Sequence, residues 1–261
     1  MMQLLDFFDG LAVLLFVISL WVIVFLRYVL VAGIFSLVFY VFFKKRYLHR
    51  KISTRLRSSS QHWKEIAWSC CTSLIFALSG LGLVWLWQKG YTKVYIGNTH
   101  SILFTVGSLF LAVLLHETYY YWLHRWMHRP KVYRWVHKVH HDSIVTSPWT
   151  AFSFHPLESL LQAVVVPLLV LIIPMHLYAL VFLLIFMTVS ATINHLDVEI
   201  YPQHFEQHWL GKWLIGATHH SLHHAKFIEN YGLYFTFWDK WMNTESSDFE
   251  RVFQEKTRPK D

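Results

Sequence analysis

The feature that most constrains this chain is a series of long apolar runs separated by short polar segments. These runs lie near residues 11–43, 66–87, 101–123, 157–173 and 176–194. A helix needs about 20 apolar residues to cross the hydrocarbon core of a bilayer. The composition agrees, because 55% hydrophobic and 15% charged residues are unusual for a soluble domain of 261 residues. The runs predict an all-α, multi-pass transmembrane protein.

The first run is expected to be a retained anchor and not a cleaved signal. Asp6 and Asp9 stand where a secretory signal carries basic residues, and the apolar stretch is too long for a cleavable segment. Arg27 lies inside this run, so it is expected to face other helices or to reach an interface, with packing favoured over catalysis.

The distribution of positive charge predicts the orientation. Twenty of the 23 lysines and arginines lie in 44–64, in 125–138 or after 211. Segments rich in these residues stay cytoplasmic. With five crossings, the N-terminus would lie outside, and residues 124–156 and 195–261 would form a cytoplasmic cap on a single membrane domain. Within this cap, the aromatic and polar pattern of 201–216 predicts a helix along the membrane interface.

The net charge of +7 does not favour nucleic-acid binding. The basic residues flank the apolar runs, so anionic lipid headgroups and the insertion rule account for them. Two adjacent cysteines inside a run, Cys70 and Cys71, give neither a disulfide framework nor a thiolate metal site.

Histidines supply the chemistry. Fifteen of the eighteen lie between His116 and His224, mostly in the clusters HRWMH (124–128), HKVHH (137–141) and HHSLHH (219–224). Residues at i, i+3 and i+4 share one face of a helix, so each cluster can direct several imidazoles at one point. Together with a histidine at the end of the fifth run, the predicted metal ligands are His124, His128, His137, His140, His141, His195, His220, His223 and His224.

Nine imidazoles are more than one metal ion needs. A zinc ion is satisfied by about four ligands, so the set favours two ions. Imidazole without thiolate suits iron, zinc, copper or nickel, and the scarcity of clustered carboxylates disfavours magnesium and calcium. Five further residues could extend or support the ligand set: His116, Glu117, Asp142, Glu199 and His219. For the carboxylates among them, ordinary salt bridges are an equally good interpretation.

The clusters and their flanks resemble the histidine boxes of the fatty acid hydroxylase/sterol desaturase superfamily. The resemblance runs from about residue 105 to 245 and includes Tyr121-Trp122, Trp135, Asn230-Tyr231-Gly232, Trp238-Asp239 and Thr244. Two positions depart from the family pattern. Asn243 stands where glycine is frequent, which predicts a left-handed turn that asparagine tolerates, and Glu117 stands where aspartate is common.

This resemblance implies a non-haem centre of two iron ions, with zinc as an alternative occupant after purification. Such a centre uses O2 and two electrons to hydroxylate or desaturate a lipid, such as a fatty acyl chain or a sterol. No dinucleotide, flavin or haem motif is present, so electrons are expected from a separate ferredoxin, cytochrome b5 or reductase. The host membrane would be a bacterial inner membrane or the endoplasmic reticulum. A membrane zinc hydrolase and a metal-ion carrier remain the alternatives.

Overall fold

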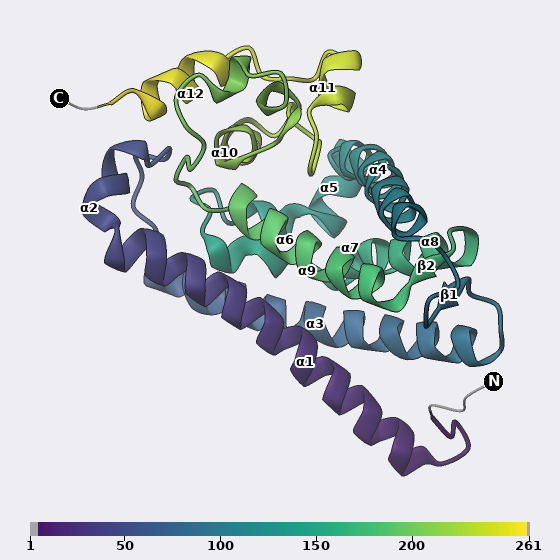
Figure 1. The fold of residues 1–261 in the computed structure, drawn as a ribbon. Helices are drawn as coiled ribbons and strands as arrows, with labels where there is room; N and C mark the ends of the chain where they lie inside the picture. Colours follow the sequence, from purple (N-terminus) through teal and green to yellow (C-terminus); the bar gives the residue numbers. More distant parts are fainter. Residues whose placement is uncertain (1–4, 260–261) are drawn as a thin grey trace.

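The protein is built almost entirely from helices. The computed structural model describes residues 5–259 (Figure 1). Within these residues, four helices are long and apolar enough to cross a membrane, by length and composition: α1 (Gly10–Ser36, continued by a π-helical segment over Leu37–Phe42), α3 (Ser59–Gln88), α4 (Ile102–Met127) and α9 (Leu177–Asn194). The predicted all-α fold with several candidate membrane helices is confirmed.

The run at 157–173 differs from a regular spanning helix. It forms two short helices, α7 (Pro156–Ala163) and α8 (Val165–Ile172). Pro167 has no N–H to offer the carbonyl of Ala163, and the hydroxyl of Ser79 donates to that carbonyl instead, at 2.9 Å. Seventeen helical residues rise only about 25 Å, less than the roughly 30 Å of a hydrocarbon core. The described chain therefore has four candidate spans where the sequence predicted five, and a crossing by α7 and α8 stays a prediction.

The loops that lie farthest from the histidine clusters are held together by hydrogen bonds at one end of the helical assembly. The backbone N–H of Leu5 donates to the Gln88 side chain at 2.9 Å, and that of Lys93 donates to the carbonyl of Val170 at 2.7 Å. Strand β1 (Val94–Tyr95) pairs in parallel with β2 (Met175–His176) at this end. Helices α4 and α9 both finish at the other end, where their C-cap residues are His128 and His195.

Short elements surround that other end (Figure 1). They are α2 (Lys44–Tyr47), α5 (Pro130–Val136), α6 (Lys138–His141), α10 (Ala217–Lys226), α11 (Phe237–Trp241), α12 (Phe249–Thr257), and 3-10 turns at Leu48–Arg50, Pro148–Phe152, Phe205–Gln207 and Gly211–Trp213.

The interfacial helix predicted for 201–216 does not form, and that prediction was wrong. His204 has a left-handed conformation, with φ of 62°. A Cβ at Gly211 would lie 1.9 Å from the carbonyl oxygen of Phe205. The segment folds back on itself and forms two 3-10 turns, because the close backbone approach between these turns is incompatible with one continuous helix.

Packing between α1 and the 3-10 turn at Pro148–Phe152 ties the first helix to the histidine-rich end. The hydroxyl of Tyr28 donates to the carbonyl of Trp149 at 2.9 Å, and its ring stacks on Phe152. A separate apolar core joins α4, α8 and α9 through residues such as Ala112, Val170 and Leu183. Together these contacts fix where the helix ends stand relative to one another.

Candidate metal centre

The predicted ligands meet where several helices end. His124 lies in the last turn of α4 and His128 is its C-cap, while His195 is the C-cap of α9. The remaining six come from α6 with its N-cap (His137, His140 and His141) and from α10 (His220, His223 and His224). Segments separated by up to 100 residues therefore converge at one place.

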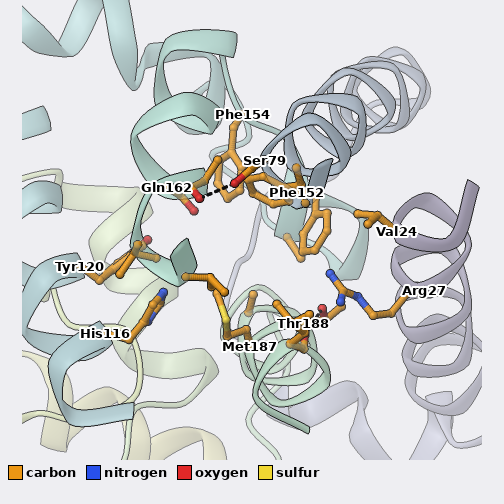
Figure 2. A pocket seen from close by; sticks show the side chains of 18 of the residues that line it. Val24, Arg27, Ser79, His116, Tyr120, Phe152, Phe154, Gln162, Met187 and Thr188 are labelled. Carbon is orange, nitrogen blue, oxygen red and sulfur yellow. Dashed lines mark hydrogen bonds between the residues drawn. The ribbon is translucent and has the colours of Figure 1, made fainter. Parts of the chain in front are cut away.

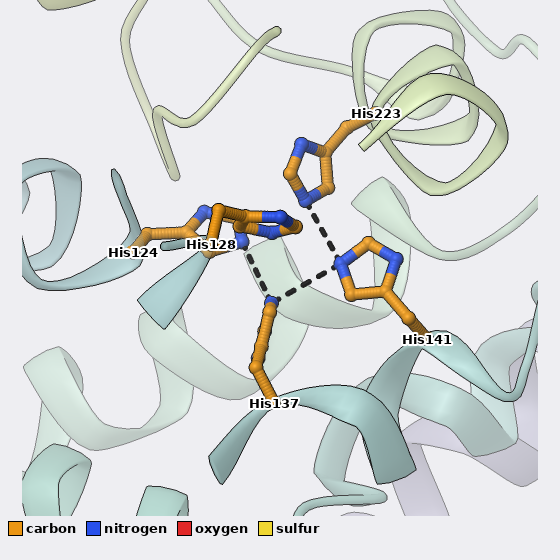
Figure 3. Close-up of side chains that lie close together, drawn as sticks. All are labelled: His124, His128, His137, His141 and His223. Carbon is orange, nitrogen blue, oxygen red and sulfur yellow. Dashed lines mark hydrogen bonds between the residues drawn. The ribbon is translucent and has the colours of Figure 1, made fainter. Parts of the chain in front are cut away.

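The nine rings separate into two groups. One contains His124, His128, His137, His141 and His223 (Figure 3), and the other contains His140, His195, His220 and His224. Within each group, one nitrogen from every ring lies within 4.8 Å of one from every other ring. The sequence predicted a common cluster but not this partition.

The Nε2 atoms face one another at short range. In the first group, His137 Nε2 is 3.0 Å from His124 Nε2 and 3.1 Å from His141 Nε2. In the second group, His195 Nε2 is 3.1 Å from His140 Nε2 and 2.9 Å from His220 Nε2.

Backbone carbonyls fix which ring nitrogen carries the proton. The Nδ1 atoms of His124, His195 and His223 lie 2.8, 2.7 and 2.7 Å from the carbonyl oxygens of Tyr231, Ala191 and Glu229, respectively. A carbonyl oxygen can only accept, so each Nδ1 is the protonated nitrogen and each Nε2 carries a lone pair. His128 Nε2 is buried and has no hydrogen-bond partner among the described residues.

Neutral rings are the form that binds metal. Burial lowers the pKa of His195 and of His223 to about 4, so both are uncharged at pH 7. Several inward lone pairs about 3 Å apart repel one another unless a cation lies among them. The donor set therefore fits one transition-metal ion in each group.

Carboxylates hold the elements that carry the ligands. Glu199 accepts hydrogen bonds from the N–H of Thr218 at 3.1 Å and from its hydroxyl at 2.6 Å, which anchors the first turn of α10. Glu117 accepts from the N–H groups of Leu233 at 3.1 Å and Tyr234 at 2.7 Å, tying α4 to the segment that follows α10. In these contacts both acids thus accept from backbone N–H groups, and Glu199 also from a hydroxyl, but neither accepts from an imidazole.

The other three candidate residues lie outside both groups. His116 is buried in α4 and contacts the ring of Tyr234, and His219 stacks on Phe249 with its Nε2 3.5 Å from Glu245. Asp142 is exposed and pairs with Lys138 at 2.6 Å. The geometry therefore gives none of them a place in the ligand groups.

The segment after α10 depends on two backbone features, a close approach at Gly232 and a left-handed turn at Asn243. The sequence predicted the second. Asp239 accepts from the N–H groups of Tyr231 and Gly232, each at 2.8 Å. A Cβ at Gly232 would lie 2.9 Å from Asp239 Oδ2, so only glycine allows this approach. Asn243 has φ of 52°, which confirms the predicted left-handed turn.

One contact residue was missed in the sequence. Glu158 of α7 is fully buried, and its Oε1 lies 2.9 Å from His137 Nδ1. A carboxylate on the far nitrogen of a metal-binding imidazole orients the ring and raises its basicity. The available signal was an acidic residue at the start of an apolar run, which by itself favours a functional role.

An apolar cavity adjoins the second group. Its wall comes from α1, α3, α4, α7, α8 and α9, and His195 is one of its lining residues. Figure 2 shows Tyr120 and His116 on one side and Arg27 and Val24 on the other, with Phe152, Phe154, Met187 and Thr188 between them. The cavity thus connects a hydrocarbon-like interior to a histidine of the candidate metal centre.

The histidine-rich part of the chain is similar in sequence to proteins of a known family. The sequence model of the fatty acid hydroxylase family matches residues 109–244, which hold all nine histidines. The chain is 27% identical over 253 residues to a Delta(7)-sterol 5(6)-desaturase of Saccharomyces cerevisiae, covering 92% of this chain and 64% of the relative. It is 30% identical over 178 residues to a Gibberella zeae protein of the same description, covering 60% and 53%.

A lathosterol oxidase of Mus musculus is 28% identical over 188 residues, covering 68% of this chain and 58% of the relative. The chain thus spans between about half and two thirds of the length of these relatives. No solved structure matches the chain.

Proposed function

The chain belongs to the fatty acid hydroxylase family, and from that premise we propose that it is a membrane oxidoreductase that hydroxylates or desaturates a lipid with O2. The observation that carries the proposal is the pair of buried imidazole groups beside an apolar cavity. The names of the relatives, sterol desaturases and a lathosterol oxidase, favour a sterol or a similar lipid as the substrate.

Two iron ions would occupy the two groups. His124, His128, His137, His141 and His223 would hold one, and His140, His195, His220 and His224 the other. Such a pair supplies the activation of O2 and the oxidation of an unactivated C–H bond when bound. Imidazole ligands also accept zinc, so zinc in a purified sample would be a replacement for iron.

The protein itself positions and protects the reactants. The apolar cavity holds a hydrocarbon against His195 and keeps water from the reacting carbon. Glu158 holds the ring of His137, and Glu199 holds α10, so that the inward nitrogens stay aligned without rearrangement.

The two alternative functions are less well supported. A zinc hydrolase needs a carboxylate base beside its metal, and among the described residues neither group contains a carboxylate. A carrier would place ligands near the middle of its spans, whereas these lie at the ends of α4 and α9.

We place the metal centre on the cytoplasmic side, because the end that carries it also carries most of the lysines and arginines. Arg129, the N-cap of α5, and Lys131 and Arg134 within α5 are exposed, and we call these three residues the basic face. This face would dock a separate, acidic electron donor such as a ferredoxin, cytochrome b5 or reductase.

Metal analysis and lipid profiling test the proposal. The purified full-length protein should contain about two irons per chain after loading. Cells that express it should accumulate an oxidised lipid only in the presence of O2. Zinc-dependent hydrolysis of a lipid ester, or metal flux across vesicles without lipid oxidation, would instead support one of the alternatives.

A further inference from the structure

Arg27 is a cation in the wall of the apolar cavity. Leu20, Val24 and Arg27 of α1 follow one another at helical spacing and all line the cavity. Figure 2 shows the Arg27 side chain extending from α1 toward Thr188 of α9. The next residue, Tyr28, donates to the carbonyl of Trp149, so Arg27 lies where the cavity wall meets the turn at Pro148–Phe152.

The guanidinium has no partner within the described part of the chain. Its Nε is buried without a hydrogen bond, and no ion pair or hydrogen bond involves the other nitrogens. No aspartate or glutamate lines the cavity among the described residues. The hydroxyls of Ser79 and Thr188 donate to backbone carbonyls, and the amide of Gln162 donates to Glu158.

A guanidinium in an apolar wall is costly when the protein offers it no acceptor, because it carries five N–H donors and its buried Nε has no hydrogen-bond partner. A ligand that brings an oxygen acceptor into the cavity would remove this cost through hydrogen bonds to a charged donor, which are among the stronger ones.

The cavity extends from this cation to the candidate metal centre along α9. Thr188 and His195 are seven residues apart, lie on the same helix face and both line the cavity. Their separation along the axis is about 10 Å. A lipid with its oxygen at Arg27 would therefore place a carbon further along its body beneath His195.

We propose that Arg27 binds the terminal oxygen of the lipid substrate, a carboxylate or a hydroxyl, and thereby selects which carbon reaches the metal centre. This inference rests on the proposed function, which identifies the cavity as the substrate site. Lipid acids and lipid alcohols share the required chemistry, because both carry an oxygen acceptor at the end of an apolar body.

Binding of matched lipid pairs to the purified, metal-loaded, full-length protein in detergent tests the proposal. One pair is octadecanoic acid and octadecane, and the other is a Δ7-sterol and its 3-deoxy counterpart. The variants are Arg27→Met, which removes the charge, and Arg27→Lys, which retains it. The matched control is Leu26→Met on the same turn, because Leu26 is 50% exposed on the outer face of α1.

In at least one pair, the oxygen-bearing lipid should bind at least about 10-fold more tightly than its oxygen-free partner. Arg27→Met should weaken binding of that lipid by about 10- to 100-fold and leave the oxygen-free lipid unchanged. Arg27→Lys should restore part of the loss, and Leu26→Met should change neither affinity. The pair that responds identifies the ligand as an acid or an alcohol.

The proposal is overturned if the unmodified protein does not distinguish the members of either pair. It is also overturned if Arg27→Met weakens both members of a pair equally, since that marks a change in cavity shape. The binding assay does not require turnover. If the lipids bind in this pattern but the protein neither takes up iron nor oxidises lipid, only the proposed function is refuted. Iron-dependent oxidation without any effect of Arg27 would refute only this inference.

Discussion

Glu158 gives the sharpest test of the metal centre, because the structure connects it to one group alone. Its side chain is fully buried, and its Oε1 lies 2.9 Å from His137 Nδ1. The side-chain amide of Gln162 donates to the same oxygen at 3.0 Å. Glu158→Gln keeps the shape of the side chain and removes the carboxyl group. The ring of His137 then loses the carboxyl group that orients it and, when ionised beside a bound metal, raises the basicity of its inward nitrogen.

Loss of such a partner lowers metal affinity by about 10- to 100-fold, which corresponds to roughly 1.4 to 2.7 kcal/mol. Only the group that contains His137 should be affected. Titration of the metal-free variant with Fe(II) under anaerobic conditions should therefore show one site of normal affinity and one weakened site. Iron content after dialysis should fall from about two per chain toward one.

Asp142→Asn is the matched control. Asp142 is adjacent in sequence to His141, but it is exposed and pairs with Lys138, so its substitution should leave both sites unchanged. Equal iron affinity of Glu158→Gln and the unmodified protein at both sites would refute the reasoning. Equal weakening of both sites would refute the separation into two groups.

Three further outcomes are expected. His140→Ala and His223→Ala each remove a ligand from a different group, so each should abolish lipid oxidation and lower iron content, and unchanged iron in both would refute the ligand assignment. Burial holds the pKa of His195 and His223 near 4, below the ordinary 6.5, so the unfolded chain binds more protons as pH falls below 6.5. The metal-free protein should lose about 2 kcal/mol of unfolding free energy for each of these two rings between pH 7 and pH 5, and a denaturant titration with equal midpoints at both pH values would contradict this. Raising ionic strength should slow turnover with a native acidic electron donor if the basic face docks it, whereas an indifferent rate would eliminate that docking site.

Several parts of the fold could be predicted from sequence because they depend on local regularity. Long apolar runs gave the helices over 11–43, 66–87, 101–123 and 176–194, since a helix in lipid satisfies its own backbone. The run at 157–173 was misjudged in form, because Pro167 breaks the helix and the hydroxyl of Ser79, from a distant helix, compensates for the break. The turn at Asn243 was predictable from one residue type, because few side chains tolerate a positive φ.

The sequence by itself determined that nine imidazoles would be available at the ends of helices, because i, i+3 and i+4 spacing fixes the faces of short helical segments. It could not assign those imidazoles to two sites. His140 and His141 are neighbours in α6 and belong to different groups, as do His223 and His224 in α10. Adjacent residues in a helix point about 100° apart, so each cluster directs rings to both sides. Only the packing of α4, α6, α9 and α10 decides which rings meet, since the rings that share a group come from segments distant in sequence. The same holds for Glu158 and Arg27. Only the tertiary structure places His137 beside Glu158 and the apolar cavity beside Arg27.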